Sequence, residues 1–241
     1  MSNAPPRVAP GVMLLSHKRN NFPVCPDRLE DAAMFSLQTI FGKGDKFFGL
    51  LEASAEAAHE SAKSLVVMLS NRGKPSSLED FALARSREKQ IAAQISEELV
   101  NTFVTALDRE DIEALGNALY KIPKTIQRFA ERYALTADKL GDVDFVTRAA
   151  MLEKCCEVIR QMVAQLRKGM VLERMKALND RLQSIESEAD RLMLELYRDL
   201  YTGDDALKFL LRRDLFEILE KAIDRCRDVG NVIYHVVLKN S

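Results

Sequence analysis

Apolar residues recur along most of the chain at steps of three and four, which is the spacing of a helix that buries one face. Glycine and proline are few, and long segments mix alanine, leucine, glutamate, lysine and arginine, all strong helix formers. The pattern predicts an all-α protein with six long helices at about 45–70, 77–105, 108–133, 145–168, 171–201 and 206–238. Because short links join long helices, we expect them to pack antiparallel in an up-and-down arrangement.

The first 33 residues lack this pattern and hold five of the seven prolines. We therefore predict a poorly ordered extension over residues 1–33, followed by a single helical domain over residues 34–241. Met34 opens the helical part and is an alternative start for the protein.

The helical part contains an internal repeat. Leu107–Ile112 (LDREDI) aligns with Leu210–Leu215 (LLRRDL) at an offset of 103 residues. The helices before these turns share their apolar steps at an offset of 101 residues. The alignment predicts two halves of three helices each, at about 45–135 and 142–239.

Charge, cysteines and motifs exclude several classes of protein. A formal net charge of −1 argues against a general nucleic-acid binder, and no apolar run reaches the roughly 20 residues that span a bilayer. The four cysteines show no CxxC spacing, and the adjacent Cys155 and Cys156 are predicted to be buried free thiols. These features predict a cytoplasmic protein. GxxxxGK[ST], GxSxG and HExxH motifs are absent, which is consistent with a protein that is not an enzyme.

Two pairs of carboxylates are candidates for a cation site. Glu186 and Asp190 are four residues apart on the fifth predicted helix, as are Asp224 and Asp228 on the sixth. This spacing places each pair on one helix face, towards the surface of the bundle. Oxygen ligands would suit magnesium, calcium, manganese, iron or zinc. The alternative is a solvated acidic face, because acidic pairs at this spacing also occur elsewhere in the chain.

The first half of the repeat carries basic or neutral residues at the positions of these acids. A cation could therefore bind in the same way only in the second half. The basic side chains could bind an anion, phosphate included, or an acidic patch of a partner, and the alternative is a solvated basic face. Arg85, Lys89 and Lys121 stand at three of these positions and Thr125 at the fourth, and Lys124 lies close by in the sequence.

Three segments carry a resemblance to a known family: TFVTALDREDIEAL at 102–115, IESEADRLMLELY at 185–197 and LEKAIDRCRDVGNVIYHVV at 219–237. They resemble the PhoU-related phosphate-transport regulators, and more narrowly the domain-of-unknown-function-47 branch, accessory proteins of low-affinity Pit-type phosphate transporters. The resemblance covers about residues 34–239. It implies two three-helix bundles related by a pseudo-twofold axis, with metal clusters held by E/D-x-x-x-D motifs on the bundle surface.

Residue by residue, the resemblance assigns metal binding to the two acidic pairs of the second half, while Arg227 stands where the family often has an acid. It implies a non-enzymatic regulator whose partner is a low-affinity phosphate transporter or its signalling partner, at the inner face of the membrane. A homo-oligomer is compatible with this. The alternatives are a metal-free helical scaffold for protein contacts and a ferritin-like di-iron protein. The latter needs two Glu-x-x-His motifs, of which only Glu56-Ala-Ala-His59 fits.

Overall fold

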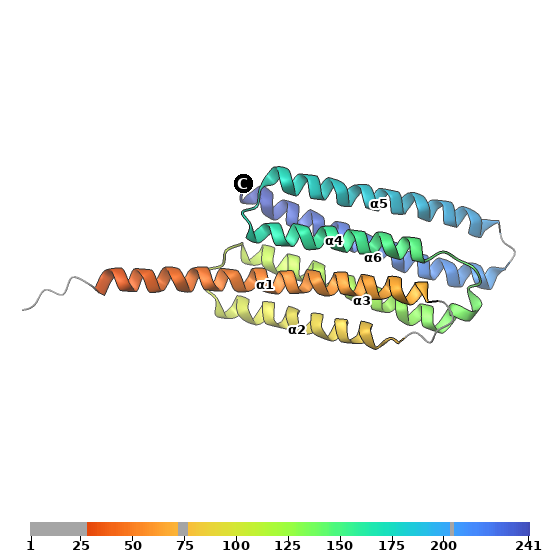
Figure 1. Cartoon of the computed structure of the whole chain (residues 1–241), viewed down its shortest axis with the longest axis horizontal. Coiled ribbons are helices and arrows are strands. Elements are labelled where there is room, and N and C mark those ends of the chain that lie inside the picture. The colour runs from red at the N-terminus through yellow and green to blue at the C-terminus, as the bar shows by residue number, and fades with distance from the viewer. Residues whose placement is uncertain (1–27, 72–76, 203–204) are drawn as a thin grey trace, which may run out of the picture. The chain divides into compact units, whose positions relative to one another are not determined.

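The computed structural model describes residues 28–71, 77–202 and 205–241, and in these residues it contains six α-helices, one short 3-10 helix and no strand (Figure 1). The all-α prediction is confirmed, with six long helices close to the predicted ranges. The elements are α1 (Arg28–Ser70), α2 (Glu79–Asn101), α3 (Arg109–Thr136), η1 (Ala137–Lys139), α4 (Val146–Arg167), α5 (Leu172–Tyr201) and α6 (Ala206–Lys239).

The first helix differs from its prediction, because α1 begins at Arg28 and not near residue 45. Residues 28–44 contain alanine, leucine and methionine, whose helix propensity supports the longer helix despite Gly42 and Gly44. Residues 1–27 of the predicted extension lie outside the described residues. The chain divides into two units, Met1–Leu37 and Gln38–Ser241. The predicted boundary after residue 33 stays a prediction.

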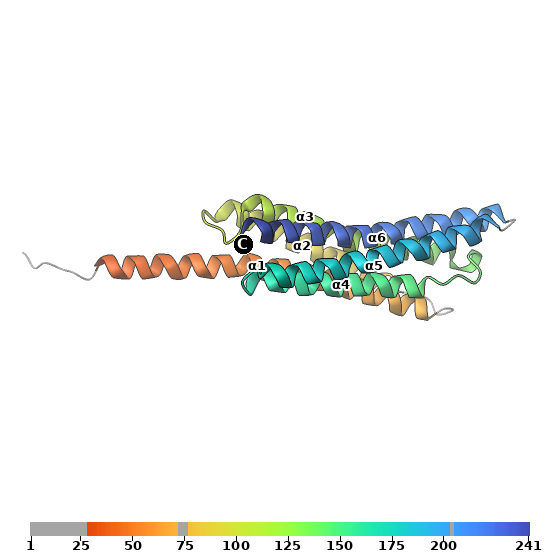
Figure 2. The ribbon, with the colours of Figure 1, turned by 90° about the horizontal axis from the view of Figure 1, so that it is seen from above.

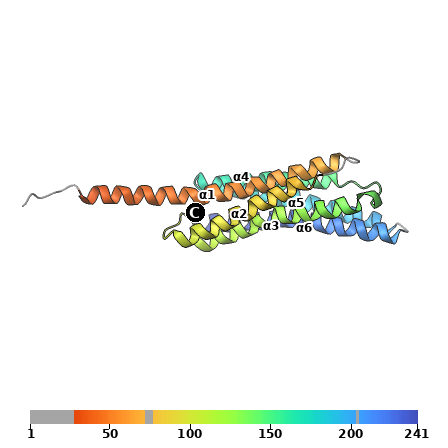
Figure 3. The ribbon, with the colours of Figure 1, turned by 90° about the horizontal axis from the view of Figure 1, so that it is seen from below.

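Within the unit Gln38–Ser241, α1, α2 and α3 form one three-helix bundle, and α4, α5 and α6 form the other. Figures 2 and 3 show the two bundles from opposite sides. The bundles meet where α3 packs along α6 and where ion pairs join α1 to α4. A pseudo-twofold relation therefore pairs α1 with α4, α2 with α5 and α3 with α6, as the family resemblance implied.

A continuous apolar core runs through both bundles. Apolar residues at steps of three and four form a stripe along α6, and this stripe is buried from Leu215 to Ile233. Phe145 and Phe216 stack with ring centroids 4.6 Å apart and tie the start of α4 to α6. Burial of each large side chain contributes about 1.5–3 kcal/mol relative to exposure, so this core holds the helices in register.

Gly230 of α6 packs tightly against α5. A Cβ atom at Gly230 would lie 2.4 Å from Cδ2 of Leu182 and 3.2 Å from Oδ1 of Asn179. The missing side chain therefore lets the two helices that carry the acidic pairs lie against each other.

Among the described residues, none of the helices combines the length and the apolar character that a membrane span requires.

Candidate functional site

The four predicted metal ligands lie on the facing sides of α5 and α6, near the bundle surface. Glu186 is buried, with 8% of its surface exposed, whereas Asp190, one turn later, is exposed. Asp224 and Asp228 are half-buried on α6. This agrees with the sequence pattern, in which Glu186 borders the apolar stripe of α5 and the other acids lie further out.

Two arginines of α6 occupy the space among these acids. The Arg227 guanidinium donates a hydrogen bond to Oε1 of Glu186, and its Nη1 lies 3.6 Å from Oδ1 of Asp224. Arg225 donates to Oδ2 of Asp228 at 3.0 Å. Three of the four predicted ligands thus have guanidinium partners, which the sequence pattern did not identify.

The pKa shifts follow from these contacts. Burial on its own lowers the pKa of Arg227, but the hydrogen bond to Glu186 and the charges of Asp224 and Asp228 outweigh it, so the net shift is upward. Arg227 is therefore a permanent positive charge. Two turns earlier on α6, burial raises the pKa of Glu220, helped by repulsion from Asp224, Asp190 and Glu217.

A metal at this place would compete with Arg227 for the oxygen atoms of Glu186 and Asp224. The described residues hold no group of three or more His, Cys, Asp or Glu side chains arranged to bind a metal ion. The predicted metal at Glu186, Asp190, Asp224 and Asp228 stays a prediction, and the donor set as folded does not fit it.

The predicted basic cluster of the first half is not uniform. Arg85 is buried on α2, whereas Lys89, Lys121 and Lys124 are exposed. The Arg85 guanidinium lies 3.9 Å from the centroid of the Tyr120 ring and donates a hydrogen bond to Tyr120 Oη. Arg85 thus packs against α3. Of the four basic side chains, the three lysines are the ones accessible to an anion in solution. Anion binding by this cluster stays a prediction.

The repeat places Arg85 and Glu186 at equivalent positions, 101 residues apart on the second helix of each bundle. Each is a buried charge, and each contacts the third helix of its own bundle, Arg85 through Tyr120 and Glu186 through Arg227. The position has kept its buried charge while the sign has been reversed.

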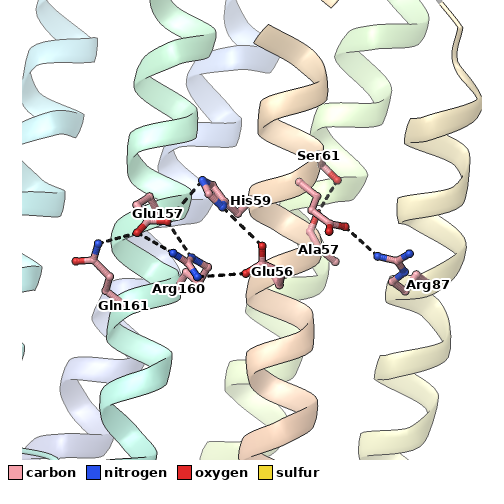
Figure 4. Close-up of polar contacts among 9 residues, drawn as sticks. Glu56, Ala57, His59, Ser61, Arg87, Glu157, Arg160 and Gln161 are labelled. Atoms are coloured by element: carbon pink, nitrogen blue, oxygen red, sulfur yellow. Dashed lines mark hydrogen bonds and ion pairs between the residues drawn. The ribbon is translucent and has the colours of Figure 1, made fainter. Parts of the chain in front are cut away.

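A second polar cluster lies between α1 and α4 (Figure 4). His59 of α1 is buried; its Nε2 lies 3.6 Å from Oε2 of Glu157 and its Nδ1 lies 4.0 Å from Oε1 of Glu56. Arg160 points between the two carboxylates, donating to Glu157 at 2.9 and 3.0 Å and lying 3.5 Å from Glu56. Gln161 also donates to Glu157.

The surroundings in this cluster lower both the pKa of the acid Glu157 and the pKa of the base His59. The hydrogen bond from Arg160 lowers the pKa of Glu157 to about 2, against the opposing effect of burial. Burial, followed by the charge of Lys63, lowers the pKa of His59 despite the nearby carboxylates. The histidine is therefore neutral near pH 7 and the cluster ties the two bundles together.

This cluster bears on the ferritin-like alternative. Glu56 and His59 supply one Glu-x-x-His motif, but Arg160 lies at the carboxylates where a di-iron centre would need iron. The geometry therefore does not favour that alternative. Sequence reasoning noted the motif and missed its partners; the i, i+3 spacing of Glu157 and Arg160 was the available signal.

Glu88 is a further buried acid that the sequence pattern did not identify. Its Oε1 accepts a hydrogen bond from the Ser54 hydroxyl of α1, and its Oε2 has no hydrogen-bond partner among the described residues. Burial raises the pKa of Glu88 to about 7, although the Ser54 hydrogen bond and the charge of Arg85 oppose the shift.

Comparison with known proteins places this geometry in context. No protein-family model matches the chain. The chain is 22% identical over 201 residues to a candidate pit accessory protein of Rhizobium meliloti (strain 1021), covering 81% of the chain and 94% of that protein. It is 24% identical over 206 residues to the UPF0111 protein YkaA of Bacillus subtilis (strain 168), covering 83% of the chain and 98% of that protein.

Two crystal structures from Shewanella oneidensis MR-1 share the fold. One is a PhoU-like protein, with a TM-score of 0.72. The other is described as a PhoU-like phosphate regulatory protein, with a TM-score of 0.69. Each is 15% identical in sequence, and each match covers 80% of this chain and 99% of the other. The fold is therefore PhoU-like, and the resemblance predicted from the sequence is confirmed.

Proposed function

We propose that this chain, which has the PhoU-like fold, is a non-enzymatic accessory regulator of inorganic phosphate transport that contacts a Pit-type transporter at the cytoplasmic face of the membrane. The observation that carries the proposal is the similarity to a candidate pit accessory protein over about four-fifths of the chain and nearly all of that protein. The shared fold supports it, because the same helices and turns are available for contacts.

The surface supports a protein that acts through contacts. Many acids and bases of the described helices pair with each other, as in Arg227 with Glu186 and Arg160 with Glu157. A regulator needs an exposed surface that a partner can cover, and it needs no reacting group.

The turn between α2 and α3 is the part of this surface that we assign to the transporter. Phe103 is 99% exposed and Val100 is 83% exposed, with Val104 exposed beside them. Large apolar side chains gathered in water mark contact sites, and burial of one phenylalanine contributes about 1.5–3 kcal/mol to binding. A cytoplasmic loop of the transporter is the proposed occupant.

The proposal is tested by phosphate uptake and by capture of the transporter. Deletion of the gene is expected to change phosphate uptake, and the tagged protein is expected to retain a Pit-type transporter from solubilised membranes. The variant Phe103→Ser should weaken this capture about tenfold or more. The control is Leu135→Ser, which alters another exposed apolar side chain, at the opposite end of α3.

Normal uptake in the deletion strain, together with no transporter in the captured fraction, would overturn the proposal. Equal capture by Phe103→Ser and Leu135→Ser would move the contact away from the α2–α3 turn while leaving the regulator intact.

A helical scaffold for other protein contacts is the second candidate function. It is favoured by the same observation that sets the metal aside, namely that Arg227 and Arg225 already pair with Glu186, Asp224 and Asp228. A metal is therefore not part of our proposed function. Unchanged phosphate uptake with specific capture of a different protein would favour the scaffold. The assembly of the chain into a homo-oligomer stays a prediction.

A further inference from the structure

We propose that Arg227 is a resident cation of the second bundle, whose guanidinium takes the place of the metal ion that the spacing of Glu186, Asp190, Asp224 and Asp228 predicts. The inference concerns the second bundle alone and does not rest on the transporter contact.

Arg227 links Glu186 of α5 to Asp224 of α6. A metal held by acids on α5 and α6 would draw Glu186 and Asp224 to one positive charge. Arg227 already does this, since its guanidinium donates to Glu186 across the helix pair and its Nη1 is 3.6 Å from Asp224. Gly230 allows the close approach of α5 and α6 one turn further along α6.

The positive charge of Arg227 balances the negative charge of the buried Glu186. A buried carboxylate needs a counter-charge, because removing an unpaired ion from water is costly. Glu186 is buried, and Arg227 meets that need with a group that stays protonated at every physiological pH. A divalent cation approaching the same oxygens would be repelled by the guanidinium at short range.

Asp228 and Asp190 are the other two acids of the predicted metal site. Arg225 holds Asp228 at 3.0 Å, and Asp190 is exposed one turn beyond Glu186. Asp224 lies beside Arg227, and Asp190 and Glu217 add negative charge to the same surface. Removal of the arginine therefore leaves an acidic surface, to which Arg227→Asp would add a further carboxylate.

The experiment measures Mn²⁺ binding to the full-length protein by isothermal titration, with bound metal determined by mass spectrometry after dialysis. Wild type is expected to retain no stoichiometric Mn²⁺. The variant Arg227→Asp is expected to bind Mn²⁺ at least about tenfold more tightly than wild type, because a repelling charge is replaced by a ligand. Adding Glu186→Gln to that variant should abolish the gain.

The matched control is Arg213→Asp, which makes the same change of charge on α6. Arg213 pairs with Glu217 at 2.7 Å, and none of its described hydrogen bonds or ion pairs involves the four predicted ligands. It should leave Mn²⁺ binding near the wild-type level. A comparable gain in Arg213→Asp would reduce the effect to net charge and overturn the proposal.

Two further results would overturn it. One is stoichiometric Mn²⁺ in wild type that is lost in Asp224→Ala, and the other is a folded Arg227→Asp protein that binds no more Mn²⁺ than wild type. Circular dichroism reports folding, and if Arg227→Asp does not fold, Arg227→Gln tests the same gain with a neutral side chain. The wild-type measurement needs no variant, and neither readout depends on phosphate uptake.

Discussion

Arg85 lies face to face with Tyr120, its guanidinium carbon 3.9 Å from the centre of the ring and one amino group donating to the phenol oxygen. The pair joins α2 to α3 inside the first bundle. Arg85 stands at the repeat position of Glu186, which in the second bundle pairs with Arg227. The two contacts differ in chemistry, but both neutralise or satisfy a buried charge on the middle helix of a bundle.

The Arg85–Tyr120 contact predicts that Arg85 stabilises the fold. Arg85→Ala should lower the free energy of unfolding by about 2 kcal/mol, because it removes a cation–π contact and a buried hydrogen bond. Chemical denaturation measures the change. Lys89→Ala, on the same helix but exposed, is the control and should stay within about 0.5 kcal/mol of wild type. Equal effects of the two variants would contradict the assignment.

Glu88 predicts a pH dependence of stability. Its pKa is raised to about 7 in the folded protein from an ordinary value of 4.5, so the folded state binds the proton more tightly between these values. Stability should therefore fall as pH rises from about 5 to 8, by an amount of the order of 3 kcal/mol.

The matched variants for this effect are Glu88→Gln and Glu97→Gln. Glu88→Gln should flatten the dependence and stabilise the protein above pH 7, because the amide carries no charge. Glu97 is exposed on the same helix, and its variant should follow the wild-type curve. Denaturation at pH 5, 6.5 and 8 measures all three proteins; a Glu88→Gln curve parallel to wild type would rule out Glu88 as the source.

The Arg160–Glu157 pair predicts a loss of stability in acid at the seam between the bundles. The depressed pKa of Glu157, about 2, gives stability that is present above pH 4.5 and lost as pH falls towards 2. Arg160→Lys loses the paired hydrogen bonds to Glu157 and should cost about 1 kcal/mol or less, since both side chains are partly solvated. An NMR titration should show the pKa of Glu157 moving up. Arg87→Lys, which alters the exposed pair with Glu60, should leave it in place.

Gly230 predicts a steric limit between α5 and α6. Gly230→Ala gains helix propensity but places a methyl group against Leu182, so we expect a net loss of about 1–3 kcal/mol. Gly169→Ala is not a suitable control because Gly169 has a positive φ of 109°. Asn231→Ala, exposed beside Gly230, should be close to neutral. A stabilised Gly230→Ala protein would show that the helices can separate at no cost.

The buried thiols predict slow labelling. Cys155, Cys156 and Cys226 are buried, as predicted for the first two, and burial raises the pKa of Cys155 and of Cys226. In a Cys25→Ser background, which removes the cysteine outside the described residues, these three should react with a thiol reagent at least about a hundredfold more slowly than after denaturation. Rapid reaction of the folded protein would indicate frequent opening of α4 from α6.

The helices and their apolar faces could be predicted because both depend on local sequence. The α6 stripe from Leu215 to Ile233 is buried as its spacing predicts, and the repeat gave the two bundles. The start of α1 could not be predicted from the apolar pattern, because residues 1–33 are rich in proline and lack a helical period, and helix propensity alone supports the segment before residue 45.

The partners of the polar side chains could not be predicted in the same way. Glu186 and Arg227 are 41 residues apart, and Ser54 and Glu88 are 34 residues apart. Whether such side chains meet depends on the rotation of two helices about their axes, which a single sequence does not specify. The acidic spacing identified the right surface, and only the folded chain shows an arginine at its centre.

The seam between α1 and α4 is lined by acids on one side and arginines on the other. Asp45, Glu52 and Glu56 of the first half meet Arg160 and Arg167 of the second half. Two copies of the first half would bring acid against acid along this seam, so the halves of the repeat are no longer interchangeable. The duplicated chain recognises its own other half by charge, and a fragment of either half would be expected to prefer its complement to itself.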